Sequence, residues 1–107
     1  MRYKVKILPS ALEDLKKIQD WYLIQFDAST ALKVVNHILN SIERLEEHPD
    51  SGSLTPDNWL NNQGYRMVIC SKHVVIYKHI GCDVYIYHIA DTQTDYKKLF
   101  LKWYNIL

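Results

Sequence analysis

Two kinds of hydrophobic periodicity divide the chain. Between residues 10 and 47 apolar side chains recur every three or four positions, which is the spacing of one helix face. Between residues 64 and 95 short runs rich in Val, Ile and Tyr are separated by two-residue turns. The first pattern predicts helices over residues 10–26 and about 29–47, and the second predicts β-strands over residues 65–70, 73–80 and 83–90.

The segment before the first helix, residues 2–8, alternates basic and apolar side chains, and this period of two predicts a strand with one solvated face. Pro9 ends the strand, and Ser10 and Glu13 have the spacing of a capping box at a helix start. Asp27 to Thr30 interrupt the helical pattern with residues that favour helix caps. The two apolar stripes consist of Leu12, Leu15, Ile18, Tyr22 and Phe26, and of Ala31, Val35, Ile38, Ile42 and Leu45.

The rest of the chain completes an α+β pattern. Residues 49–64 are rich in Pro, Gly, Asn and Asp and predict a long loop, which we expect Trp59 and Leu60 to anchor. Apolar residues at helical spacing near the C-terminus predict a short last helix. We therefore expect a single domain over residues 1–107: an N-terminal strand, a two-helix hairpin, a three-stranded antiparallel meander that completes a four-stranded sheet, and the C-terminal helix.

The turns at 71–72 and 81–82 predict which side chains meet on the meander. They pair residue 77 with 86 and residue 75 with 88, so that His73, Tyr77 and His88 share one face. Arg66 lies on the neighbouring strand, close enough to join them. An arginine, two histidines and a tyrosine on one surface can hold a phosphate and transfer protons around it.

Each of these residues also has a structural interpretation. For Arg66 a phosphate-binding role and a structural role, as a solvated strand residue or an ion-pair partner of the hairpin, are about equally well supported. A histidine such as His88 in an apolar strand is more often a core residue bonded to a carbonyl. Lys72 and His73 stand at a turn, where polar residues are common. The chain has eight tyrosines, so a structural role is the more frequent one for either Tyr77 or Tyr96. Asp95 fits the N-cap of the last helix.

Composition narrows the class of protein. Of 107 residues, 48% are hydrophobic and 23% charged, which is typical of a globular chain, and the net charge is +1, so any nucleic-acid binding must depend on a local patch. No apolar run has the length of a signal peptide or a membrane span, and we expect a soluble, cytoplasmic protein. Cys70 and Cys82 should lie about 25 Å or more apart as buried thiols, without a disulfide. The five histidines lack metal-ligand spacing, so we expect no metal or cofactor.

Three stretches, ALEDLKKIQDWY, SIERLEEHPDSG and GYRMVICSKHVVIYKHIGCDVYIYHIADTQTDYKKLF, together resemble the RelE/ParE superfamily of bacterial toxins. The resemblance rests on the A-x-x-D-L helix start, the I-x-x-L-x-x-x-P helix end, the Y-R and V-I-Y of successive strands and the closing D-Y. It covers nearly the whole chain. It implies a cytoplasmic toxin that a cognate antitoxin neutralises by lying across its surface.

Two activities occur in the superfamily, and from the resemblance we expect an endoribonuclease that cuts messenger RNA, with a gyrase inhibitor as the alternative. RelE-type members are metal-independent endoribonucleases that cut messenger RNA, typically on the ribosome, whereas ParE-type members poison DNA gyrase and cut nothing. A member that retains only antitoxin binding is a third alternative. Many relatives carry a histidine and an Arg-Arg pair after the last strand, where this chain has Asp91, Gln93 and Thr94, a change that removes phosphate contacts.

For the nuclease, matching positions suggest a set of roles. Arg66 matches a phosphate-binding arginine and Tyr96 falls near a C-terminal tyrosine of the nucleases, while His88 could supply an imidazole. In this hypothesis His88, or otherwise Asp91, takes the proton of the ribose 2′-hydroxyl. The charge on the phosphate is offset by Arg66 with Lys72 or His73, and the leaving oxygen is protonated by Tyr96 or His73, with Tyr77 as a further phosphate contact.

Overall fold

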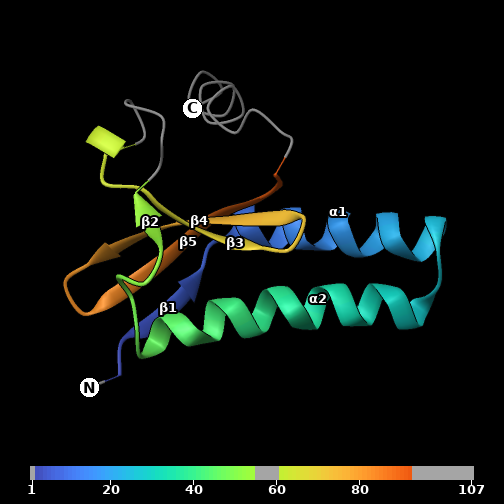
Figure 1. Cartoon of the computed structure of the whole chain (residues 1–107), viewed down its shortest axis with the longest axis horizontal. Coiled ribbons are helices and arrows are strands. Elements are labelled where there is room, and N and C mark those ends of the chain that lie inside the picture. The colour runs from blue at the N-terminus through green and yellow to red at the C-terminus, as the bar shows by residue number, and fades with distance from the viewer. Residues whose placement is uncertain (1, 55–60, 93–107) are drawn as a thin grey trace.

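The computed structural model describes residues 2–54 and 61–92 (Figure 1). The strands and helices predicted within these ranges are confirmed, and a short strand is added. In chain order the elements are β1 Lys4–Ile7, α1 Pro9–Gln25, α2 Ala28–Glu43, the 3-10 turn η1 Arg44–Glu46, β2 Ser53–Leu54, β3 Arg66–Cys70, β4 His73–Ile80 and β5 Asp83–Asp91. The predicted C-terminal helix, the loop anchors Trp59 and Leu60, and Tyr96 lie outside the described residues.

The strands form one mixed sheet in the order β1-β5-β4-β3-β2. The meander β3-β4-β5 is antiparallel, as the two turns predict, whereas β1 pairs in parallel with β5 along Lys4–Asp83 to Ile7–Ile86. The two-residue strand β2 was not predicted. It pairs Ser53 with Met67 and so ties the end of the loop after η1 to the outer edge of β3.

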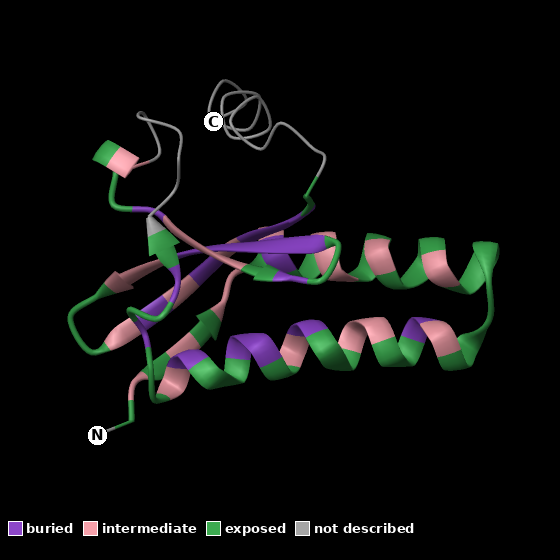
Figure 2. Ribbon diagram, in the orientation of Figure 1, coloured by how far each residue is buried: buried purple, intermediate pink, exposed green. Residues whose placement is uncertain are grey.

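Helices α1 and α2 lie side by side as a hairpin whose far end projects past the strands (Figure 1). Buried residues gather on the strands and along the α2 face nearest the sheet, while the far end of the hairpin is largely exposed (Figure 2). The main core joins both layers, with Ala11, Ile38, Ile42 and Leu45 packed against Val75, Tyr77, Val84, Ile86 and Ile89. Burial of this apolar surface is what holds the hairpin to the sheet.

The start of α1 differs from the predicted capping box. The helix begins one residue earlier, at Pro9, and its N-cap is Leu8, which has no capping side chain. Ser10 therefore lies inside the first turn, and its hydroxyl donates to the carbonyl of Tyr87 at 2.6 Å. The cap predicted between the helices is confirmed, because the Asp27 carboxylate accepts from the N–H of Thr30 at 2.7 Å.

Side chains of α1 cover the part of the β5 edge that β1 leaves open. Strand β1 stops opposite Ile86, and the next groups of β5 are met by the Ser10 hydroxyl and by Asp14, whose carboxylate accepts from the N–H of Ile89 at 3.0 Å. Buried backbone groups need such partners. The first turns of α1 thus act as a continuation of the sheet and fix the hairpin to β5.

The cysteine prediction is half right. Both thiols are free, but only Cys70 is buried, whereas Cys82 is exposed in the turn between β4 and β5. The Ser41 hydroxyl bonds the Cys70 sulfur at 3.2 Å. No helix in the described part of the chain is long and apolar enough to span a bilayer.

Candidate functional site

A register shift in the β4–β5 pair changes which candidate residues meet. The predicted pairing of Tyr77 with Ile86 is confirmed, but His88 pairs with Ile76 and not with Val75, because Tyr87 is an extra residue on β5. A bulge of one residue moves the following side chains to the other face of the sheet. The predicted common face for His73, Tyr77 and His88 is therefore wrong with respect to His88.

Arg66 and His88 stand in different rows of the sheet. Arg66 lies opposite Tyr77 in the row that ends at Ile86, on the face covered by the helices, whereas His88 lies in the next row with Ile76 and Met67. Neighbouring rows point to opposite faces. Of three clefts lined by described residues, none includes the side chain of Arg66 or His88.

Arg66 is held by the loop that follows η1. Its guanidinium donates to the carbonyl of Gly52 at 3.0 Å, and its Nε lies 3.5 Å from the carboxylate of Asp50. The same carboxylate lies 3.0 Å from Nδ1 of His79, and this contact, followed by smaller charge effects of His79 and Arg66, lowers the pKa of Asp50. Arg66 thus forms an ion pair, but its partner is the loop and not the hairpin that the structural interpretation predicted. A phosphate-binding role for Arg66 stays a prediction.

Tyr77 fixes the same loop from inside the core. Its hydroxyl donates to the carbonyl of Pro49 at 2.7 Å and accepts from the N–H of Gly52 at 3.1 Å, and its ring is fully buried. A Cβ at position 52 would lie 2.5 Å from that hydroxyl, so only glycine fits this close approach. Burial raises the pKa of Tyr77, which keeps the hydroxyl protonated as a donor.

His88 is a buried histidine with a carboxylate partner. Its Nδ1 lies 2.9 Å from the Asp14 oxygen that also accepts from the backbone of Ile89. The structural interpretation of His88 is right in outline, although the partner is a carboxylate of α1 and not a backbone carbonyl. Asp14 was not predicted as part of a site, because nothing in its spacing links it to His88, which lies 74 positions away.

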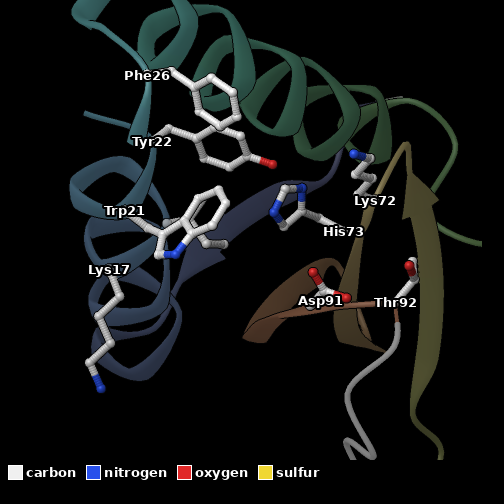
Figure 3. A pocket seen from close by; sticks show the side chains of 9 residues that line it. Lys17, Trp21, Tyr22, Phe26, Lys72, His73, Asp91 and Thr92 are labelled. Carbon is white, nitrogen blue, oxygen red and sulfur yellow. The ribbon is translucent and has the colours of Figure 1, made fainter. Parts of the chain in front are cut away.

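Three other candidates do meet, at the opposite end of β4. Lys72, His73 and Asp91 line a cleft of about 530 Å³ between the second half of α1 and the ends of β4 and β5 (Figure 3). His73 pairs with Asp91 in the strand register, and its ring points toward Tyr22 on α1, with 6.0 Å between ring centroids. The opposite wall, formed by Lys17, Trp21 and Phe26, was not predicted as part of any site.

The cleft contains an imidazole with free hydrogen-bonding capacity. His73 is only 6% exposed, and within the described ranges its ring nitrogens make no hydrogen bond. No fully buried side-chain nitrogen or oxygen in the described part of the chain lacks a partner, so these nitrogens are open to the cleft. Burial lowers the pKa of His73; the charge of Asp91 opposes this shift and the charge of Lys72 adds to it. The ring is therefore held neutral near pH 7, able to donate one bond and accept another.

The same geometry limits the chemistry available. No group of three or more His, Cys, Asp or Glu side chains within residues 2–54 and 61–92 is arranged to hold a metal ion. The residues predicted to act together are divided among three places: Arg66 and Tyr77 at the loop, His88 at the β5 edge, and Lys72, His73 and Asp91 in the cleft. Tyr96 lies outside the described residues.

Comparison with known proteins identifies the family. Residues 5–96 match the family model described as the ParE toxin of the type II toxin-antitoxin system parDE. The chain belongs to the ParE toxin family. It is thus the toxin of a type II toxin-antitoxin system, within the wider RelE/ParE superfamily that its sequence resembles.

Solved structures share the fold of this toxin. A chain of the chromosomal ParDE system from P. aeruginosa superposes with a TM-score of 0.73 at 20% sequence identity, covering 86% of this chain and 98% of the other. A chain of the RelBE2 toxin-antitoxin complex from Mycobacterium tuberculosis superposes with a TM-score of 0.64 at 15% identity, covering 85% and 99%. No curated protein matches the toxin. The description of the matching family, a toxin of a type II toxin-antitoxin system, supports a cognate antitoxin as its partner.

Proposed function

We propose that this toxin arrests growth by binding DNA gyrase and that it does not cut messenger RNA. The observation that supports this proposal most strongly is the position of Arg66. Its guanidinium is occupied by Gly52 and Asp50, in a different row of the sheet from His88. Residues 5–96 match the ParE toxin model, and in the superfamily that the sequence resembles the ParE-type members are the ones that poison gyrase.

A nuclease of the predicted type needs a base, a phosphate-binding cation and an acid around one scissile bond. Proton transfer requires the base within about 3 Å of the hydroxyl that it deprotonates. His88 is bonded to Asp14 beside α1, and Arg66 is bonded to the loop after η1. A phosphate held by Arg66 would have no imidazole of His88 on the same face of the sheet.

Endoribonuclease activity remains the second candidate, because one observation favours it. Lys72, His73 and Asp91 line a common cleft, and a neutral imidazole beside a lysine can act as a base next to a phosphate. In that case the catalytic group would be His73, assisted by Lys72, and ribosome-bound messenger RNA would be the substrate. Arg66, His88 and Tyr77 would have structural roles only.

Induction of the toxin in cells that lack the antitoxin separates the two candidates. Primer extension on abundant transcripts and an assay for double-strand breaks are carried out on the same culture. The gyrase proposal predicts intact transcripts together with DNA damage. New transcript ends that appear before any damage, and that disappear with His73→Gln, would contradict it and favour the nuclease.

A further inference from the structure

Three side chains of the sheet bind the loop after η1. Tyr77 and Arg66 hold it at Gly52 and Asp50, and His79 on β4 makes a further contact with Asp50. A guanidinium stays charged at any physiological pH, and burial raises the pKa of Tyr77, so that its hydroxyl stays protonated. An imidazole, in contrast, gains and loses a proton between about pH 5 and 8. Among these three contacts, the one made by His79 is therefore the one that pH can change.

Both ring nitrogens of His79 face acceptors. Nδ1 lies 3.0 Å from the carboxylate of Asp50, and Nε2 lies 2.9 Å from the backbone carbonyl of Gly81 in the β4–β5 turn. Neither partner has a proton to donate, because the lowered pKa of Asp50 keeps its carboxylate ionised and a carbonyl oxygen only accepts. A neutral imidazole carries one N–H, so either tautomer leaves one acceptor without a donor. The two contacts are hydrogen bonds at the same time only when the ring carries both protons.

The groups that face this ring come from four parts of the chain. The carboxylate of Asp50 attracts the ring proton, and the guanidinium of Arg66 on β3, whose Nε lies 3.5 Å from the same carboxylate oxygen, repels it. The ring of Tyr3 packs edge-on against the imidazole with 4.9 Å between centroids, and the paired residue on β5 is the apolar Val84. Because the side chain of His79 is 19% exposed, its ring can exchange protons with solvent.

We propose that protonated His79 joins the loop after η1 to the β4–β5 turn, and that loss of one ring proton releases one of the two contacts. In the protonated state the ring bridges the Asp50 carboxylate and the Gly81 carbonyl. When a proton leaves for solvent, the remaining N–H binds a single acceptor and the link between the two segments is broken. Acidification thus strengthens the attachment of the loop, and a rise in pH weakens it. This pH switch goes beyond the proposed function, since it does not depend on whether the target is gyrase or RNA.

Nuclear magnetic resonance on the wild-type toxin tests the pH switch without any substitution. The ¹⁵N chemical shifts of the His79 ring report how many of its nitrogens carry a proton. Exchange of the Gly52 N–H, which donates to the hydroxyl of Tyr77, reports how firmly the loop is attached. We expect two protonated ring nitrogens at low pH and one at high pH. Over the same interval, exchange at Gly52 relative to its intrinsic rate at each pH should accelerate about threefold, as the loss of one hydrogen bond implies.

Two variants separate this switch from other titrating groups. The side chain in His79→Gln does not titrate, so the pH-dependent step in exchange at Gly52 should disappear. Asp50→Asn should also remove the step, because its amide can donate to the neutral imidazole and accept from the protonated one, so both contacts persist in either state. His48→Gln is the matched control: it removes an exposed histidine of the same segment whose ring forms no hydrogen bond with a described residue, and the step should stay as in wild type.

Three results would overturn the pH switch. One is a single protonated nitrogen in the His79 ring at every pH at which the fold persists. Another is exchange at Gly52 that stays constant while the ring titrates. The third is a full step retained in His79→Gln and lost in His73→Gln, which would assign it to the imidazole at the other end of β4. The first two measurements use the wild-type toxin, so they decide the proposal even where a variant does not accumulate.

Discussion

Arg66 and His88 stand in adjacent rows of the sheet and are bonded to separate carboxylates, Asp50 and Asp14. Each residue fastens a different segment to the strands. Arg66 holds the loop after η1, and His88 holds the first turns of α1. Both contacts therefore contribute to the stability of the fold.

Substitution of Arg66 should reduce stability and leave toxicity intact. Arg66→Met keeps the length of the side chain and removes its bonds to Gly52 and Asp50; because the side chain is 28% exposed, we expect a loss of only about 1 kcal/mol. Chemical denaturation measures this loss, and Arg2→Met, which removes two exposed ion pairs, should stay within about 0.5 kcal/mol of wild type. Loss of growth arrest at unchanged stability would assign Arg66 an active role.

The positions of the strands could be predicted from the sequence, whereas the contacts of the candidate residues could not. Two-residue turns and dense runs of Val, Ile and Tyr define β3, β4 and β5, since such patterns depend on near neighbours. The extra residue at Tyr87 produces no such pattern. It shifts His88 by one position against β4 and so moves it away from Tyr77.

Long-range bonds explain the other differences. The sequence around Tyr77 predicts only a strand residue like its neighbours. Nothing in it indicates the bond to Gly52, which lies 25 positions away in the loop. Ser10 has the spacing of a capping residue, but the unpaired carbonyl of Tyr87 lies within reach of its hydroxyl and receives that bond. The α1 wall of the cleft that contains Lys72, His73 and Asp91 was missed because α1 shares no sequence pattern with the ends of β4 and β5.

The Tyr77 hydroxyl should contribute substantially to stability. Tyr77→Phe leaves the carbonyl of Pro49 and the N–H of Gly52 without a partner in a buried place, and we expect a loss of about 2 kcal/mol in the free energy of unfolding. Gly52→Ala should be at least as damaging, since its Cβ would also lie 2.7 Å from the carbonyl of Met67. In the double variant the two losses should be less than additive, and strict additivity in denaturation would contradict the direct contact.

The carboxylate of Asp14 should stabilise the fold because it accepts a hydrogen bond from β5. Asp14→Ala removes the partner of the Ile89 N–H and of the His88 ring, and a loss of about 2 to 3 kcal/mol is expected. Asp14→Asn retains an oxygen acceptor and should lose less. Amide hydrogen exchange provides the local readout: exchange at Ile89 should accelerate in the alanine variant, while Asp20→Ala, an exposed change on the same helix, leaves it unchanged.

The buried imidazole of His73 should make stability depend on pH. Because burial lowers its pKa below the ordinary value of 6.5, the unfolded chain binds a proton more readily than the folded one. The neutral ring of His73 should thus make its full contribution to the free energy of unfolding above about pH 6.5. This contribution should decline as the pH falls from there toward the lower pKa of the folded state. His73→Gln should flatten this decline in denaturation series, and an unchanged slope would show that another group causes it.

Purified components show whether the toxin acts on gyrase as a protein target. Supercoiling by DNA gyrase is measured with increasing toxin, with and without the antitoxin, and a messenger RNA is incubated in parallel with ribosomes and toxin. If the toxin acts on gyrase, supercoiling is lost while cleaved DNA accumulates, the antitoxin reverses both effects, and the RNA stays intact. Full gyrase activity at toxin concentrations that cut the RNA would contradict this action on gyrase.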